Sequence, residues 1–465
     1  MDSTVAAAAP DARPLALVGP GGIAAWKAAQ DDATRAWLGA SGFEGKPGDL
    51  ALLPTRDAGA VGAVFVFADD GSSEDFWRLA GLPARLPAGA PWGIATPIDA
   101  AVATRAATAW ATGGYQFDRY RKAARDPARL AMPAGADAAA VARWADADRF
   151  VRDLINTPAQ DMGPGELAAA ATAMAAELGM QARIVTGADL LAEGHRLIHA
   201  VGRASSRPPR LIDLSWGDPA HPRVTLVGKG VCFDTGGLDI KGADGMKLMK
   251  KDMGGGAHVL GLARMIVRAG LRLRLRVLVA AVENSISGNA FRPLDIVTSR
   301  KGLTVEIGNT DAEGRLILAD ALDLASEDRP GLLIDMATLT GAARVALGPD
   351  LPAAFCNDET VAAALARHAA AEADPVWRLP LWKPYRAMLD SKAADINNVS
   401  SGPMGGSITA ALFMQEFVGA GIPWLHFDIY AWNASAKPGR PEGAQAQAIR
   451  ALFAMIAERA SAQVA

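Results

Sequence analysis

The segment Asn309–Leu316 (Asn-Thr-Asp-Ala-Glu-Gly-Arg-Leu) carries three charged side chains at alternate positions, Asp311, Glu313 and Arg315. An extended chain points residues i, i+2 and i+4 to one face, and the helical pattern 316–326 follows at once. The spacing therefore predicts that two carboxylates and a guanidinium converge beside the start of a helix. Taken alone, such a group is as compatible with an ion-pair cluster as with a binding site.

Two more carboxylates and a lysine precede this segment. Lys229 follows the apolar run 224–227, so it stands at the carboxyl end of a predicted strand, where open α/β sheets bind their ligands. Asp234 and Asp252 follow, and each stands two residues before a pair of glycines. Burying four carboxylates together is prohibitive without cations. If these segments meet, we expect one or two divalent metals, and oxygen ligands suit zinc, manganese, cobalt or magnesium.

Other catalytic chemistries lack their sequence patterns. None of the six histidines forms His-Glu-x-x-His, which disfavours a histidine-based zinc protease. A Ser-His-Asp hydrolase with the Gly-x-Ser-x-Gly pattern is disfavoured for the same reason. The turn Gly228-Lys229-Gly230 is similar to a phosphate-binding turn, but the full P-loop pattern is absent, which disfavours nucleotide binding there.

The composition is that of an ordinary globular protein. The chain has 465 residues, which favours two domains over one core; 50% of its residues are hydrophobic and 21% are charged. A net charge of −3 gives no basic field that would attract nucleic acid or an anionic membrane. Two cysteines, no signal-peptide pattern and no bilayer-spanning apolar run favour a soluble, cytoplasmic protein. We therefore expect no membrane partner and no nucleic-acid partner.

The pattern along the chain predicts three parts. Residues 1–135 indicate a small N-terminal α/β domain with a loose tail at residues 1–12, and residues 136–158 indicate a connecting helix that stops at a Thr-Pro pair. Residues 159–465 indicate a larger catalytic domain, in which strand-like runs alternate with helical segments. We expect an α/β fold with a mixed, largely parallel sheet flanked by helices. The strand-like runs are 183–185, 224–227, 275–282, 332–336 and 424–429, and the helical segments are 165–178, 258–268, 316–326 and 408–418.

The motifs together resemble those of the leucine aminopeptidase (cytosol aminopeptidase) family of two-metal exopeptidases. The family signature Asn-Thr-Asp-Ala-Glu-Gly-Arg-Leu is intact, and Val-Gly-Lys-Gly, Phe-Asp-Thr-Gly-Gly, Ile-Lys and Asp-Met-Gly-Gly precede it in the family's order. The steps between the charged positions, from Lys229 through residues 234, 241 and 252 to Asp311, are 5, 7, 11 and 59 residues, which is the family's spacing. The resemblance covers roughly residues 150–465 and is weak before Tyr115.

The resemblance implies a role for each metal-binding position. Asp234 and Glu313 would bridge two divalent ions, zinc or manganese with cobalt or magnesium as alternatives. Lys229 and Asp252 would complete the tighter site, and Asp311 the more exchangeable one. A lysine can ligate only as the neutral amine, so the dication must depress its pKa strongly. Such a pair of ions would activate a water for attack on the first peptide carbonyl.

The remaining catalytic roles also come from the resemblance. Lys241 would stay outside the metal shell and stabilise the charge that develops on the carbonyl oxygen. Arg315 would hold a bicarbonate ion that shuttles a proton, helped by backbone amides near Leu339. Asp252 would bind the free α-amine of the substrate, which restricts cleavage to the N-terminus.

The pocket for the first side chain departs from the family at two positions. Met249, Thr338, Leu339 and Gly341 match family substrate-binding residues, whereas Tyr430 and Asn433 stand where small or apolar residues are usual. We expect an apolar first residue, leucine-like or methionine-like. The resemblance also implies short peptide substrates and a homohexamer built as a dimer of trimers.

Two alternatives from other classes stay open. One is a nucleic-acid-binding regulator that keeps the peptidase site incidentally, which a salt-sensitive shift assay would support. Arg272, Arg274 and Arg276 alternate with leucines, but this pattern favours the solvated face of an edge strand. The other is a non-catalytic metal-binding scaffold, against which the intact Lys241 and Arg315 argue.

Overall fold

The structure is a computed structural model, and it describes residues 4–7, 9–54, 61–68 and 70–462. The chain forms two compact units. The first contains residues 1–149 with 434–442, and the second contains residues 150–433 with 443–465. Among the described helices, none is both long enough and apolar enough to cross a membrane. The predicted division at residues 135 and 158 stays a prediction.

The first unit contains a six-stranded sheet with the order β1-β6-β5-β2-β4-β3, parallel except for β3. Its strands are β1 Val5–Ala6, β2 Arg13–Val18, β3 Leu50–Pro54, β4 Val61–Val66, β5 Trp92–Ile94 and β6 Leu130–Ala131. Its helices are η1 Pro20–Gly22, α1 Ile23–Ala28, α2 Asp32–Ala40, α3 Ser73–Ala80, α4 Leu82–Arg85 and α5 Ala100–Gly113, and α6 Ala138–Asn156 continues into the second unit.

The loose tail expected at residues 1–12 is wrong for Val5–Ala6. These two residues form β1 and pair in parallel with Leu130–Ala131. Val5 is buried, so its burial and the strand pairing fix a segment whose sequence lacks a strand pattern of its own. Residues 1–3 and 8 lie outside the described part of the chain.

The second unit is built on an eight-stranded sheet with the order β15-β14-β17-β13-β9-β10-β8-β7. The four central strands β17, β13, β9 and β10 are parallel. β8 pairs antiparallel with β10 and β7, and β14 pairs antiparallel with β17 but parallel with β15. The main strands are β7 Gln181–Thr186, β8 Arg210–Trp216, β9 Arg223–Asp234, β10 Arg274–Asn284, β13 Leu332–Ala337, β14 Ala353–Cys356, β15 Trp377–Arg378 and β17 Trp424–Asp428. Two small sheets contain β11 Ile296–Thr298, β12 Thr304–Glu306 and β16 Ile396–Asn397, and β18 Trp432–Asn433 and β19 Gly443–Ala444.

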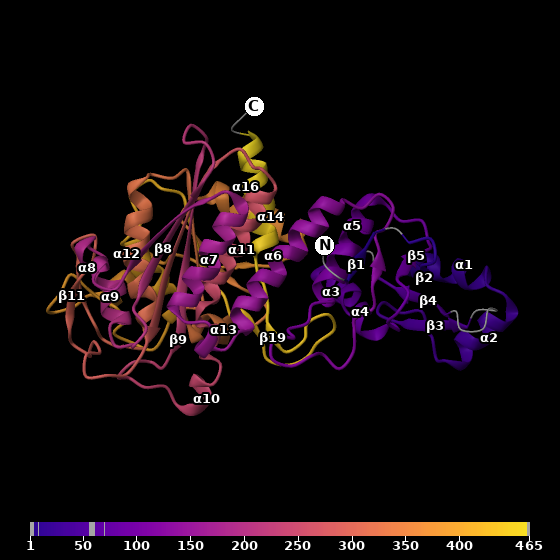
Figure 1. The fold of residues 1–465 in the computed structure, drawn as a ribbon, viewed down its shortest axis with the longest axis horizontal. Helices are drawn as coiled ribbons and strands as arrows, with labels where there is room; N and C mark the ends of the chain where they lie inside the picture. The colour runs from indigo at the N-terminus through magenta and orange to yellow at the C-terminus, as the bar shows by residue number, and fades with distance from the viewer. Residues whose placement is uncertain (1–3, 8, 55–60, 69, 463–465) are drawn as a thin grey trace. The chain divides into compact units, whose positions relative to one another are not determined.

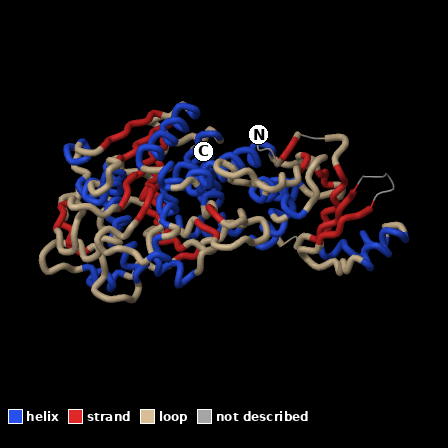
Figure 2. Tube along the Cα trace, turned by 60° about the horizontal axis from the view of Figure 1, so that its bottom comes forward, coloured by secondary structure: helices blue, strands red, loops and turns tan. Residues whose placement is uncertain are grey.

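Helices lie on both faces of this sheet (Figure 1). In the tube view of Figure 2, the red strands are drawn next to blue helices and tan loops. The longer helices are α7 Pro164–Leu178, α11 Gly254–Arg268, α12 Glu313–Glu327, α14 Glu359–Ala371, α15 Gly406–Gln415 and α16 Ile449–Ala462. The short ones are η2 Ala159–Asp161, α8 Asp189–Ala192, α9 Arg196–Gly202, α10 Ala243–Met246, η3 Met249–Met253, α13 Gly341–Leu347 and η4 Lys383–Leu389. The expected mixed, largely parallel sheet flanked by helices is therefore confirmed.

The arginine-rich strand is a correction to the sequence analysis. β10 is an interior strand between β9 and β8, not an edge strand. Arg276 is only partly exposed and donates to both carboxylate oxygens of Asp213 and to Asp328. Ion pairs with Asp213 and Asp328 therefore allow Arg276 to lie in an interior strand. The alternation with leucine in the sequence does not show that these partners are nearby.

Successive residues of β9 face the two helical layers. A Cβ on Gly228 would lie 2.6 Å from Gly256 of α11, whereas the side chain of Lys229 lies against Gly314 of α12. Because neighbouring residues of a strand point to opposite faces, α11 and α12 cover opposite faces of the sheet. The core on the α12 side contains buried residues from β9, β10, α9 and α12. The start of each helix thereby comes next to the same strand.

Glycine permits α11 to pack closely on β13. A Cβ on Gly255 would lie 2.0 Å from the carbonyl oxygen of Met336, a distance that no side chain can occupy unless backbone moves. The close contact fixes the segment η3, which leads directly into α11. The first turn of α11 thus sets the position of Asp252, two residues before the helix.

We expect Gly255→Ala to lower the free energy of unfolding by about 1–3 kcal/mol or more, because overpacking here displaces a buried strand. Urea denaturation monitored by tryptophan fluorescence would measure the change. Gly288→Ala is the matched control, since a Cβ at Gly288 would meet no atom within 4 Å. Equal stability of the two variants would contradict the packing argument.

Candidate active site

A cavity of about 520 Å³ lies at the carboxyl-terminal ends of β9 and β13 and is closed by η3 and the start of α12. The structure brings all of the predicted site residues except Asn433 to its wall. Those that line it are Lys229, Asp234, Lys241, Met249, Asp252, Asp311, Glu313, Arg315, Thr338, Leu339, Gly341 and Tyr430. Segments separated by about 200 residues of sequence thus form one site, as the strand-end argument predicts.

Lys229 lies at the centre of the buried part of this site. Its side chain is 3% exposed, and its Nζ lies 2.7 Å from Asp252 Oδ2 and 2.9 Å from Glu313 Oε1. The same ammonium donates to the carbonyl oxygen of Thr338 at 2.9 Å. A Cβ on Gly314 would lie 2.5 Å from Lys229 Cε, so the glycine in the signature gives the lysine its room.

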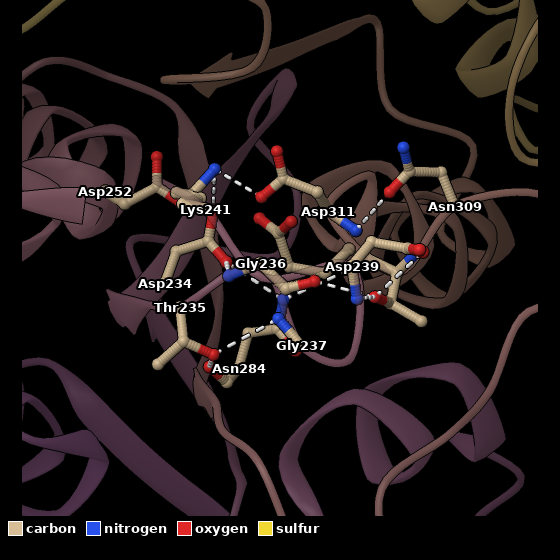
Figure 3. A network of polar contacts seen from close by, with 12 residues as sticks. Asp234, Thr235, Gly236, Gly237, Asp239, Lys241, Asp252, Asn284, Asn309 and Asp311 are labelled. Atoms are coloured by element: carbon tan, nitrogen blue, oxygen red, sulfur yellow. Dashed lines mark hydrogen bonds and ion pairs between the residues drawn. The ribbon is translucent and has the colours of Figure 1, made fainter. Parts of the chain in front are cut away.

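Asp234 ends β9 and is held by neutral donors as well as by a cation (Figure 3). Its Oδ1 accepts from Asn284 Nδ2 and from the Gly236 amide, both at 2.9 Å, and its Oδ2 lies 2.9 Å from Lys241 Nζ. Lys241 also forms an ion pair with Asp311. Lys241 therefore joins the two aspartates at the more open side of the cluster.

Asp252 is anchored by the loop that follows β13. The hydroxyl of Thr338 lies 2.9 Å from Asp252 Oδ1 and 2.9 Å from the Asp252 carbonyl oxygen. The loop is fixed in turn by Asp428 at the end of β17, which accepts from the amides of Leu339 and Thr340 and from the Thr340 hydroxyl. The ends of two neighbouring strands, β13 and β17, thus contribute to the placement of one carboxylate.

The charged residues of the signature segment come together, but the backbone that carries them is not the extended chain that the sequence predicts. Glu313 and Arg315 belong to the first turn of α12, so the alternation argument for an extended chain does not apply to them. Asp311 lies in the preceding turn, and Asn398 fixes that turn by accepting from Gly308 and donating to the Asn309 carbonyl oxygen. The charged groups still converge, because a turn followed by a helix brings them to the same cavity.

Arg315 is buried, and one of its N–H groups donates to the Asn398 carbonyl oxygen at 2.7 Å. Its Nε has no hydrogen-bond partner among the described residues. Burial lowers the pKa of this guanidinium to about 10, although the charges of Glu313 and Asp428 oppose the shift. A cavity-lining cation with free donor capacity is suited to an anion.

In the cluster, burial and the neighbouring opposite charges shift the pKa of Lys229 and of Asp252 in opposite directions. Burial alone would lower the pKa of Lys229, but the charges of Asp252 and Glu313 outweigh it and raise that pKa. Burial would raise the pKa of Asp252, but Lys229 lowers it. Burial, and then the charge of Asp234, raise the pKa of Glu313 to about 8, and the same two causes raise the pKa of Asp311. The lysines therefore do not fully compensate the carboxylates.

This donor set fits a divalent metal. Oxygen atoms of Asp234, Asp252 and Glu313 lie within 4.8 Å of one another, and all three residues are buried. Glu313 Oε2 accepts no hydrogen bond from any described residue. With Asp311, four carboxylates form ion pairs with only two ammonium groups, so additional positive charge would stabilise the site.

The far wall of the cavity carries charge. Tyr430 lies between two cations: Lys251 Nζ is 4.7 Å from the centre of its ring, and the Arg344 guanidinium is 5.3 Å from it. Both cations line the cavity. Asn433 is buried in β18, and the structure does not bring it to the cavity.

Sequence reasoning missed three residues that hold the site together. Asn284 and Asp428 end strands adjacent to those that carry the motifs, so their position at strand ends is a signal that could have found them. Asn398 follows the two-residue strand β16 and has no comparable signal. Lys251 was overlooked although it precedes Asp252 directly.

A cluster of buried carboxylates and lysines at the strand ends of an α/β sheet fits a metal-dependent enzyme. Comparison with known proteins makes the assignment specific. The cytosol aminopeptidase family, catalytic domain, matches residues 149–453, and the M17 aminopeptidase N-terminal domain matches residues 13–133. The chain belongs to the cytosol aminopeptidase family, which is metal-dependent. It is therefore an aminopeptidase, a hydrolase, and the resemblance found from the motifs is confirmed.

Similar proteins cover nearly the whole chain. A crystal structure of cytosol aminopeptidase from Coxiella burnetii has 47% identity and a TM-score of 0.93, covering 98% of this chain and 99% of that one. The bottromycin maturation enzyme BotP in complex with Mn has 32% identity and a TM-score of 0.87, covering 98% and 100%. A probable cytosol aminopeptidase from Synechococcus sp. (strain WH7803) is 37% identical over 453 residues, covering 91% of each chain.

We expect Thr338→Val to weaken metal binding about 10- to 100-fold, because it removes the hydroxyl that orients Asp252 while keeping the side chain's shape. Titration of Mn²⁺ against a competing chelator would measure the affinity. Thr225→Val is the matched control, since Thr225 is equally buried in β9 but does not line this cavity. Unchanged affinity in Thr338→Val would contradict this positioning role.

Proposed function

We propose that this aminopeptidase releases N-terminal residues from short peptides with the help of two divalent metal ions per subunit. The observation that carries the proposal is the convergence of four carboxylates in one part of the cavity, where only Lys229 and Lys241 form ion pairs with them. Zinc or manganese is our first expectation, and cobalt or magnesium would suit the same oxygen donors.

The family resemblance supplies a role for each metal-binding residue, and the close approach of the carboxylates supports it. Asp234 and Glu313 would bridge the two ions, Lys229 and Asp252 would hold the tighter one, and Asp311 the more exchangeable one. Lys229 would have to give up its proton to ligate, and a dication would favour that loss by reversing the electrostatics that now raise its pKa. When bound, such ions supply Lewis acidity, which lowers the pKa of a water and polarises a peptide carbonyl.

Lys241 is suited to the developing charge on the carbonyl oxygen. Its side chain is 16% exposed and lies at the open side of the carboxylate cluster, between Asp234 and Asp311. Once cations offset those aspartates, its ammonium is free to donate a hydrogen bond to the substrate oxygen. A preorganised donor of this kind stabilises the transition state more than the ground state.

Arg315 would hold bicarbonate as the anion that accepts and passes on a proton. Its unpartnered Nε and its place on the cavity wall support this role. The Leu339 amide, expected to help, already donates to Asp428 at 3.0 Å. Arg315 would therefore carry most of the anion binding here.

The direction of cleavage depends on recognition of the substrate's α-amine. Asp252 lines the cavity next to the predicted pocket residues Met249 and Thr338, and it would accept hydrogen bonds from that amine. A blocked N-terminus would lack this contact and add bulk. The homohexamer, the cytoplasmic location and an apolar first residue stay predictions from the resemblance.

Exhaustive chelation should abolish the release of amino acids from short peptides, and Mn²⁺ or Zn²⁺ should restore it, because water activation needs the cations. Mass spectrometry of the products would also show the direction of cleavage. A peptide with a free N-terminus should lose one residue at a time, while its N-acetylated form should resist. Full activity without metal, or equal cleavage of the blocked peptide, would contradict the proposal.

Lys241→Met should lower kcat by about 10²–10³, because one preorganised oxyanion donor contributes roughly 2.7–4 kcal/mol. Bound metal, measured by elemental analysis, should stay near the wild-type level. Lys229→Met is the paired variant and should lose the tighter metal. If Lys241→Met emptied the metal site or kept kcat within a few-fold, the roles assigned to the two lysines would be wrong.

A further inference from the structure

Lys251 is a buried cation that faces the active-site cavity without a charged partner. The residue is 5% exposed, and it lines the same cavity as the metal-binding cluster. Its ammonium faces the cavity and forms no ion pair or hydrogen bond with any described residue; its contact is with the ring of Tyr430, 4.7 Å away. A buried ammonium with only an aromatic face for a partner leaves its hydrogen-bonding capacity unused.

The carboxylates near Lys251 are committed elsewhere. Asp252 contacts the Thr338 hydroxyl through Oδ1 and the Lys229 ammonium through Oδ2. Asp428 uses both oxygens on the backbone amides and hydroxyl of the loop after β13. Neither can turn to Lys251 without breaking contacts that position the metal cluster. The missing partner therefore has to come from the contents of the cavity.

A second cation extends the positive charge along this wall. The guanidinium of Arg344, on α13, lies over the same Tyr430 ring at 5.3 Å and is exposed. Among the described residues it forms no ion pair with a carboxylate. Tyr430 thus separates a buried cation from an exposed one, and both lie where the first side chain of a substrate is expected.

We propose that this wall selects substrates whose N-terminal residue is acidic, glutamate or aspartate. A side-chain carboxylate bound there would pair with Lys251 at its inner end and be attracted by Arg344 at the entrance. This inference rests on the proposed aminopeptidase function and replaces the apolar preference that the family resemblance implies. An aromatic first residue stacked on the two cations is the competing outcome.

The test compares isosteric substrates on the Mn²⁺-loaded enzyme at neutral pH. Glutamyl and glutaminyl p-nitroanilides have nearly the same shape and differ in charge, with leucyl and phenylalanyl p-nitroanilides as references. We expect kcat/KM for the glutamyl substrate to exceed that for the glutaminyl and leucyl substrates by about tenfold or more. A hydrogen bond to a charged partner corresponds to a factor of about 10–100.

Variants then assign the preference to individual cations. Lys251→Met should lower the glutamyl-to-glutaminyl ratio of kcat/KM by about 10- to 100-fold, and the ratio is taken within the variant so that a general loss of rate cancels. Arg344→Gln should lower the same ratio by a smaller factor, because its charge is screened by solvent. Lys247→Met removes an equal charge from an exposed position that does not line the cavity, and it should leave the ratio unchanged.

The outcomes separate this inference from the proposed function. A wild-type enzyme that cleaves leucyl or phenylalanyl substrates well and glutamyl no better than glutaminyl would overturn the acidic preference and leave the aminopeptidase mechanism standing. Loss of all metal-dependent release would instead overturn the mechanism. If Lys251→Met fails to fold, the wild-type ratio and the Arg344→Gln ratio still decide the question. A ratio that neither variant moves would also overturn the proposal.

Discussion

Repulsion between buried carboxylates is the constraint on which this structure depends. Asp234, Asp252 and Glu313 are held within a few ångströms of one another by backbone elements that cannot easily separate. Two lysines offset part of the charge, and burial leaves the remainder uncompensated. The site therefore needs a rigid scaffold. In a looser one the carboxylates would move apart, and the site would lose its preference for a cation.

The support comes from the interior of the sheet. β9 supplies Lys229 and Asp234, while the adjacent strands end in Asn284 and in the loop that orients Asp252. Glycines at the start of α11 bring that helix against the sheet, and Gly314 at the start of α12 leaves space for the lysine. The site is therefore as rigid as the core beneath it, a condition that hydrolytic metal sites share.

Much of this arrangement was predictable from sequence, for identifiable physical reasons. Apolar runs alternating with helical segments predict the central strands, and strand ends predict where Lys229 and its carboxylates meet. The short pairing of Val5–Ala6 and the interior place of Arg276 were not predictable, since both depend on distant partners, Leu130–Ala131 and Asp213. The lack of an ion-pair partner for Lys251 among the described residues was also not predictable, because the sequence cannot show that Asp252 and Asp428 already contact other groups.

Met249, Lys251 and Asp252 belong to one short 3-10 helix, η3, immediately before α11. One residue of this turn is expected at the metal, another touches Tyr430, and the third lies on the pocket wall. Any shift of the turn would alter reaction rate and substrate choice together. Substitutions at Tyr430 or Arg344 could change selectivity more independently, because neither residue is next in sequence to a metal-site carboxylate.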